Sequence, residues 1–143
     1  MPHLVILYTG QLDNEVKMTT LCRQMANAML TVKDEAGKQV YPTGGTRVLA
    51  YPAPHYAVAD GGAAGQAAGG TGDYAFVYLN VRMGRGRSEA TQQRAGHTLL
   101  EVAKAFFAPV MAQRHIGITL QIDVGPEVFD AKHSNLHPLF NKA

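Results

Sequence analysis

Apolar residues in the first sixty positions follow a strand, helix, strand order. Residues 4–8 (LVILY) form a continuous β-favouring run that predicts a buried strand. Apolar positions then recur at helical spacing through residues 16–32, and Asp13 or Asn14 is the candidate N-cap of this helix. After a turn rich in glycine, residues 47–51 (RVLAY) predict a second strand.

The second half of the chain repeats this order. Residues 74–81 (YAFVYLNV) are apolar on both faces of a predicted strand, and a glycine turn at 83–88 (MGRGRS) leads out of it. Two adjacent apolar stripes through residues 95–111 predict a long and heavily buried helix, which Pro109 should kink or interrupt. Strict alternation of apolar and other residues over 116–122 (IGITLQI) predicts the last strand.

Two successive β-α-β units predict an α/β (α+β) fold with a duplicated architecture. Right-handed crossovers would place both helices on one face of a mixed four-stranded sheet. The other face would then expose apolar side chains of the strands at 4–8 and 74–81. We therefore expect a homo-oligomer in which the sheets face inward.

A chain of 143 residues is long enough for one compact core, so we expect a single domain. The first repeat spans about 2–60 and the second about 73–123. The segment 61–72 (GGAAGQAAGGTG) between them has no periodicity and predicts a mobile loop, and residues 56–59 are a weaker candidate for a short strand. The tail, residues 124–143, either docks its apolar residues onto a neighbouring subunit or frays.

The amino-acid composition limits the kinds of partner that the protein is expected to bind. The net charge of +2 is too small to indicate a nucleic-acid or membrane partner. No apolar stretch has the length of a signal peptide or a membrane span, so the expected location is cytoplasmic. The single cysteine, Cys22, falls in the first predicted helix, and we interpret it as a packing residue.

The candidate chemistry rests on arginines rather than on metal ligands. The six histidines show no spacing typical of a metal site, and the chain has no nucleophile elbow, Walker loop or dinucleotide fingerprint. Arg85 and Arg87 lie in the glycine turn before the second helix, where free backbone N–H groups already favour an anion. Arg47, at the start of the second strand, is another candidate anion anchor.

Pro2 adds a base to this set if Met1 is removed, because its nitrogen then becomes a free secondary amine. An α-amino group titrates near pH 7.7 to 8.0. An apolar pocket and two nearby arginines would each disfavour its protonated form and lower its pKa. A neutral amine beside bound carboxylates could act as a general base, and the arginines would stabilise the dienolate that a proton loss creates. The pattern therefore favours a proton-shift reaction on a dicarboxylate.

Four stretches of the sequence resemble one known family. They are the opening Pro2-His3, the segment 73–77 (DYAFV), the turn 84–88 (GRGRS) with its continuation QQRAG, and the ending 135–140 (NLHPLF). Together they resemble the 5-carboxymethyl-2-hydroxymuconate isomerases of the tautomerase superfamily, alongside 4-oxalocrotonate tautomerase and macrophage migration inhibitory factor. The resemblance covers nearly the whole chain.

The resemblance implies a cofactor-independent homotrimer that binds a dicarboxylate or tricarboxylate and no metal. It implies that Pro2 is the catalytic base and that Arg47 and Arg87 bind the substrate, while Arg85 has no firm counterpart. The implied reaction ketonises the dienol 5-carboxymethyl-2-hydroxymuconate to a conjugated enone in the breakdown of homoprotocatechuate.

Three alternatives stay open on the sequence. The chain could act on a related 2-hydroxydienoate or enol acid, since the superfamily shares the amino-terminal proline across several chemistries. It could be a trimeric module that only binds anions. The GRGRS turn could contact nucleic acid, although it lacks a basic face or a stacking platform beside it.

Overall fold

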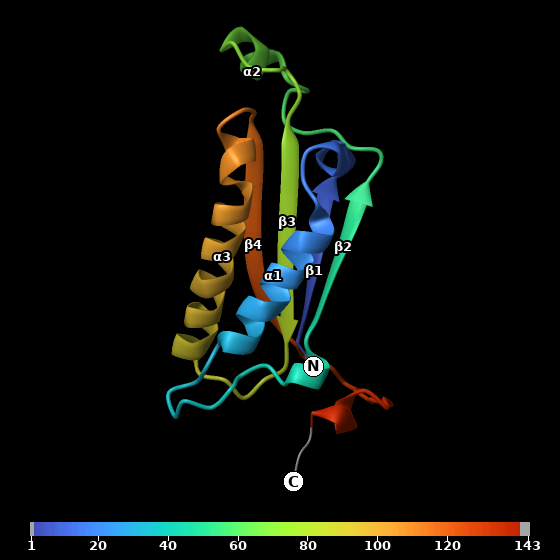
Figure 1. Ribbon diagram of the computed structural model, residues 1–143, viewed down its shortest axis with the longest axis vertical. Helices are drawn as coiled ribbons and strands as arrows, with labels where there is room; N and C mark the ends of the chain where they lie inside the picture. The colour runs from blue at the N-terminus through green and yellow to red at the C-terminus, as the bar shows by residue number, and fades with distance from the viewer. Residues whose placement is uncertain (1, 141–143) are drawn as a thin grey trace.

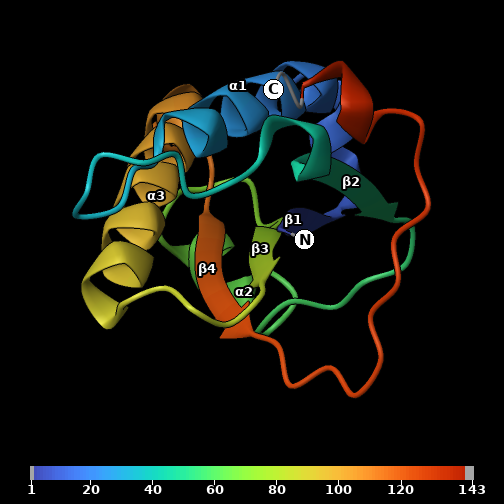
Figure 2. The same ribbon diagram turned by 90° about the horizontal axis from the view of Figure 1, so that it is seen from below.

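The computed structural model describes residues 2–140 and shows a four-stranded sheet with two long helices on one face (Figure 1, Figure 2). The strand order is β2-β1-β3-β4; β1 pairs in parallel with β2 and antiparallel with β3, and β3 pairs in parallel with β4. The long elements are β1 (His3–Thr9), α1 (Met18–Thr31), β2 (Arg47–Ala53), β3 (Ala75–Met83), α3 (Glu89–Met111) and β4 (Ile116–Val124). Shorter helical turns are η1 (Gly10–Asn14), η2 (Thr43–Gly45), α2 (Ala63–Ala67) and η3 (His137–Leu139).

All four predicted main strands and both predicted long helices are present, and the predicted fold class is confirmed. Each half is a β-α-β unit whose strands pair in parallel, and the two units join through the antiparallel pair β1 and β3. In Figure 2 both α1 and α3 lie on the same side of the sheet.

The core lies between the sheet and the helices because alternate strand residues point toward them. On the helix side of β1 and β3, residues such as Ile6 and Leu79 have no exposed surface, and they pack with Leu21 of α1 and Leu99 of α3. Full burial of one such side chain stabilises the fold by about 1.5–3 kcal/mol. This layer fixes the strand register, since a slip of one residue would turn the apolar set to the opposite face.

The opposite face of the sheet carries no covering element among the described residues. Its half nearest β2 is apolar and exposed, with Leu7, Leu49 and Tyr51, and the exposed Phe76 lies at the start of β3. Its half nearest β4 is polar: the Tyr78 hydroxyl donates to Gln121 Oε1 at 2.7 Å, and the Asn80 amide donates to Asp123 Oδ2 at 2.9 Å. We call this surface the open face.

The first helix begins later than predicted. Asp13 does not cap it, because its Oδ1 accepts a 2.6 Å hydrogen bond from the Tyr8 hydroxyl and both Asp13 and Asn14 lie in η1. The helix α1 instead starts after Lys17, whose side chain makes no capping hydrogen bond. The burial of Tyr8 and its bond to Asp13 raise the pKa of its phenol above the ordinary value.

The segment 61–72, predicted as a loop, contains the short helix α2. The carboxylate of Asp60 accepts hydrogen bonds from the N–H groups of Gly62 and Ala64 at 2.9 and 3.0 Å, and these bonds lower the pKa of Asp60. The Tyr74 hydroxyl accepts a further bond from the Gly65 N–H at 2.8 Å. These partners come from outside the segment, so its own glycines and alanines gave no indication of them.

Two smaller predictions are also corrected. Residues 56–59 form no strand, because β2 ends at Ala53 and the next residue, Pro54, has no N–H to donate to a ladder. The helix α3 continues past Pro109 to Met111. Pro109 therefore does not end the helix, although it cannot donate the backbone bond to the carbonyl four residues earlier.

The tail returns to its own subunit. After β4 it runs along the end of the sheet, and η3 contacts η2 next to the start of β1 (Figure 1). A side chain at Gly44 would lie only 2.5 Å from His137 Nδ1, so the contact requires glycine there. The predicted fraying therefore does not describe residues 137–140, whereas docking onto a neighbour stays a prediction, since Leu139 and Phe140 are exposed. Residues 141–143 lie outside the described chain, as does Met1.

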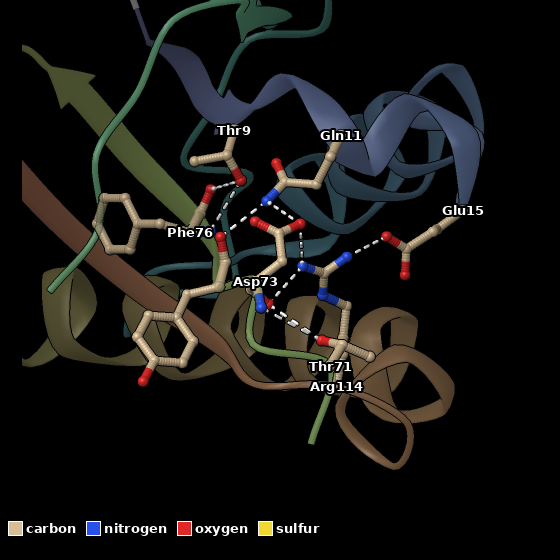
Figure 3. Close-up of polar contacts among 8 residues, drawn as sticks. Thr9, Gln11, Glu15, Thr71, Asp73, Phe76 and Arg114 are labelled. Carbon is tan, nitrogen blue, oxygen red and sulfur yellow. Dashed lines mark hydrogen bonds and ion pairs between the residues drawn. The ribbon is translucent and has the colours of Figure 1, made fainter. Parts of the chain in front are cut away.

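A polar network closes the other end of the sheet (Figure 3). Arg114, which follows α3, forms ion pairs with Glu15 and with Asp73, the latter at 3.0 Å. It also donates to the Asp73 carbonyl at 2.7 Å, while the Gln11 amide donates to the Tyr74 carbonyl at the same distance. The network ties the first repeat to the segment that enters the second repeat.

Within residues 2–140, none of the helices is long and apolar enough to cross a membrane.

Candidate active site

The sheet topology gathers the three candidate residues at one end of the molecule. β1 and β2 start at the end where the antiparallel β3 finishes (Figure 1). Pro2 directly precedes β1, Arg47 is the first residue of β2, and Arg87 follows four residues after the last residue of β3, Met83. Positions that are 45 and 40 residues apart along the chain therefore share one edge of the sheet.

Pro2 is buried and lies at the mouth of the central strand. Its neighbour His3 is the register partner of Arg47 on one side and of Arg82 on the other. Adjacent strands are about 4.8 Å apart. Pro2 thus directly precedes a position that is flanked by arginine on both neighbouring strands.

Arg47 points to the open face, because its neighbour Val48 pairs with the buried Leu4. It is half-buried, and its Nη1 donates to the Gly45 carbonyl at 3.1 Å. This bond holds the Arg47 side chain against η2, at the edge of the sheet to which the tail returns.

Arg87 is half-buried and held by backbone oxygens. Its Nη1 donates to the Gly84 carbonyl at 3.2 Å and its Nη2 donates to the Val40 carbonyl at 2.9 Å. These two bonds use two of the five N–H groups of a guanidinium. The arrangement fixes the plane of the guanidinium and keeps donors for an anion.

Arg85, in the same turn, makes a different contact. It is exposed, and its Nε donates to the Gly125 carbonyl at 2.9 Å, which ties the turn to the end of β4. The structure therefore separates the two arginines of the GRGRS turn: one bonds across to β4, and the other bonds to the connection between α1 and β2.

A buried tyrosine lies close to Arg87. Tyr41 has no exposed surface, and its hydroxyl lies 3.6 Å from the Met83 sulfur. Burial raises the pKa of Tyr41, while the charge of Arg87 acts in the opposite direction. The phenol is therefore neutral at physiological pH and adds no negative charge to this end of the molecule.

A hollow of about 270 Å³ near the start of β1 is lined by His3, Arg82, Gly84, Glu127 and Asp130, and its lining includes none of the three candidate residues. Arg82 was not singled out on the sequence. The strand register was the missing information, because it places Arg82 beside His3 and on the same face as Arg47. Larger hollows of about 460 to 610 Å³ lie along α3, under α2 and beside α1, away from the three candidate residues.

The residues described by the structure contain no group of three or more histidine, cysteine or carboxylate side chains placed to hold a metal ion.

Residues 2–140 match one family model, described as 5-carboxymethyl-2-hydroxymuconate isomerase. The chain belongs to the 5-carboxymethyl-2-hydroxymuconate isomerase family. A curated relative from Escherichia coli, 5-carboxymethyl-2-hydroxymuconate Delta-isomerase, is 26% identical over 140 residues, which are 98% of this chain and 99% of the relative. The predicted family and the predicted enzyme class, isomerase, are confirmed.

Solved structures of the isomerase family agree closely with this one. A crystal structure of 5-carboxymethyl-2-hydroxymuconate delta-isomerase is 65% identical with a TM-score of 0.96, covering 100% of this chain and 95% of the other. The isomerase of Deinococcus radiodurans R1 is 30% identical with a TM-score of 0.80, covering 99% and 95%. A fused 4-OT protein and a macrophage migration inhibitory factor-like protein, at 17% and 10% identity, share the fold.

Proposed function

We propose that this family member converts 5-carboxymethyl-2-hydroxymuconate to its conjugated enone by proton transfer, without a cofactor, in the degradation of homoprotocatechuate. The observation that carries the proposal is the buried position of Pro2 directly before β1, with Arg47 and Arg87 at the same edge of the sheet. The family membership supports the choice of substrate, since the related enzymes are named for it.

Pro2 is the proposed base. After removal of Met1, its secondary amine would accept the proton of the substrate hydroxyl at C2, and the electrons of the O–H bond would form the C2 carbonyl. The diene then shifts, and C5 receives the proton back from the prolinium. One proton leaves oxygen and one arrives at carbon, so the reaction needs no oxidant or reductant. Burial and the neighbouring guanidiniums favour the neutral amine that this step requires.

Arg47 and Arg87 are the proposed substrate anchors. Each presents a planar set of donors that matches a carboxylate. Anchoring two carboxylates would hold the diene across the Pro2 nitrogen, and the same positive charges would stabilise the dienolate as it forms. Arg85 is outside this set, because its guanidinium bonds to the end of β4.

We further propose that the single domain works as a homotrimer whose open faces turn inward. Leu7, Leu49, Tyr51 and Phe76 supply an apolar surface without cover inside the subunit. A fused 4-OT protein with the same fold is described as an asymmetric trimer. Burying this surface between subunits would also bring a neighbour's strands close to the Pro2 edge.

The test is an ultraviolet assay of 5-carboxymethyl-2-hydroxymuconate conversion by the full-length protein. Rapid formation of the enone, well above the spontaneous rate, is expected. No conversion of this dienol, with turnover of a simpler 2-hydroxydienoate, would move the activity to another chemistry of the superfamily. No conversion of either compound, with measurable binding of the dicarboxylate, would make the protein an anion-binding module.

A further inference from the structure

The connection between α1 and β2 forms a closed hairpin at residues 32–40. Val40 N–H donates to the Val32 carbonyl at 2.9 Å, and Asp34 N–H donates to the Lys38 carbonyl at 2.9 Å. The Asp34 carboxylate accepts two more backbone bonds within the turn, each at 2.9 Å. The hairpin is thus shaped by its own hydrogen bonds.

Glu35 reaches from this hairpin to the start of α3. Its Oε1 accepts hydrogen bonds from the hydroxyls of Ser88, at 2.9 Å, and Thr91. Ser88 is the N-cap of α3 and accepts a bond from the Thr91 N–H at 3.1 Å, and Thr91 has no exposed surface. The two hydroxyl donors lower the pKa of Glu35, so the carboxylate is charged at neutral pH.

Arg87 lies between this contact and a second one from the same hairpin. It immediately precedes Ser88 in the chain, and its Nη2 donates to the carbonyl of Val40, the last residue of the hairpin. A third contact joins Arg94 Nη1 to the Lys33 carbonyl at 2.6 Å. The N-cap of α3, which follows Arg87, and the carbonyl oxygen that orients the Arg87 guanidinium therefore both bond to one hairpin.

We infer that Glu35 is a positioning residue for Arg87, acting through Ser88 and the hairpin rather than by touching the substrate. Without the Glu35 carboxylate, Ser88 would lose its bond to the hairpin, and the backbone at Arg87 would be free to shift relative to the buried Val40. The guanidinium would lose its fixed plane, and a displacement of about 1 Å at a substrate-orienting group can cost up to about 100-fold in rate. This inference rests on the proposed role of Arg87 as an anchor.

The same connection also ends in η2 and then Arg47, so it links the two proposed anchors. Glu35 holds the Arg87 end of the connection. The Arg47 end is held by the bond to Gly45 and by the contact of η2 with η3. Removal of the Glu35 carboxylate should therefore weaken substrate binding by Arg87 and leave Arg47 in place.

The kinetic test compares Glu35→Ala with Glu35→Gln. We expect Glu35→Ala to raise KM for 5-carboxymethyl-2-hydroxymuconate about tenfold, with a smaller fall in kcat, because Arg87 also stabilises the dienolate while the base is untouched. Glu35→Gln keeps an oxygen acceptor and should recover most of the affinity. Glu101→Ala is the matched control, since this exposed glutamate on α3 pairs with Lys104 and should leave KM unchanged. An unchanged KM in Glu35→Ala would overturn the inference.

A double-variant cycle separates positioning from general loosening of the fold. In the Arg87→Ala background, adding Glu35→Ala should change KM no further, because the residue that it positions is absent. Additive effects in the double variant would mean that Glu35 acts on the whole fold, and the inference would be wrong.

A readout without turnover distinguishes this inference from the proposed function. The side-chain Nε–H signal of Arg87 in a ¹⁵N NMR spectrum, assigned through Arg87→Lys, should shift or broaden in Glu35→Ala and stay unchanged in Glu101→Ala. A changed signal in a protein that shows no turnover would keep the positioning role and remove the isomerase proposal. An unchanged signal would remove the positioning role whatever the activity.

Discussion

At the scale of single residues, Pro2 combines three properties that a base needs here. It is buried, it begins the central strand, and both neighbouring strands carry arginine at their ends. A secondary amine fixed in a ring also has fewer orientations than the amine of any other residue. The central strand thus holds the N-terminal nitrogen in position.

The first prediction concerns this ring. Pro2→Ala should lower kcat by about 100-fold, since the primary amine that replaces the ring nitrogen is more mobile and a poorer base. Stopped-flow or ultraviolet kinetics measure the change, and gel filtration checks that assembly is unaltered. A rate equal to that of the unaltered protein would remove Pro2 from the mechanism.

The second prediction uses the two arginines of one turn. Arg87→Ala should reduce kcat/KM by about 10- to 100-fold, the usual loss for one charged hydrogen-bonding group. Arg85→Ala is the matched control, because Arg85 bonds to Gly125 at the end of β4 and should leave kcat/KM within about threefold. Equal losses in both variants would mean that the turn as a whole, rather than Arg87, matters for binding.

Sequence reasoning at this scale reached Pro2, Arg47 and Arg87 as candidates, and the structure places them at one edge. Their roles remain predictions. It did not reach Arg82 or Glu35, because Arg82 becomes a neighbour of His3 only through the strand register and Glu35 contacts Ser88 only across 53 residues. Long-range pairings of this kind have no local pattern in the chain.

At the scale of elements, the end of the sheet far from Pro2 depends on Arg114 (Figure 3). Its side chain is only 9% exposed, while its partners Glu15 and Asp73 are 35% and 54% exposed. The guanidinium is thus the buried member of the network, and it connects α3, the segment before α1 and the segment before β3.

The third prediction tests that connection. Arg114→Met should lower the free energy of unfolding by about 1–3 kcal/mol, because it removes charged hydrogen bonds to carboxylates and to the Asp73 carbonyl. Lys104→Met removes an exposed ion pair with Glu101, whose side chains are 59% and 69% exposed, and should cost less than about 0.5 kcal/mol. Urea denaturation measures both. Equal losses would show that the burial of Arg114 adds nothing.

The elements that sequence patterns predicted correctly are those with strong periodicity, such as β4 with its strict alternation and α3 with its double stripe. The failures were short elements. The helix α2 depends on hydrogen bonds to Asp60 and Tyr74. The start of α1 depends on the hydrogen bond from Tyr8 to Asp13, which keeps Asp13 from capping the helix. In both cases a specific side-chain hydrogen bond decided the structure, which propensity alone does not encode.

At the scale of the whole molecule, helices cover one face of the sheet and leave the other face uncovered. Composition and alternation predicted this asymmetry, since the first and third strands have apolar residues on both faces. The structure shows that the exposed apolar residues gather toward the β2 edge, where Leu7, Leu49 and Tyr51 lie. Such a surface in water is typical of an interface between subunits.

The fourth prediction tests that interface. Leu49→Lys should convert a trimer of 15.4 kDa chains into smaller species, because it places a charge in the proposed contact. Met111→Lys is the matched control, since Met111 is 52% exposed on α3 and Leu49 is 45% exposed on the open face. Light scattering with gel filtration measures the mass. A monomeric unaltered protein, or a trimer in Leu49→Lys, would contradict the arrangement.

The central claim is that the nitrogen of Pro2, as a free amine, carries the reaction. The most direct measurement compares protein whose chains begin at Pro2, verified by mass spectrometry, with the same protein carrying one added residue before Pro2. The account predicts that the conversion rate rises in proportion to the fraction of chains that begin at Pro2 and is nearly absent when that nitrogen is an amide. Full activity in the extended protein would contradict it.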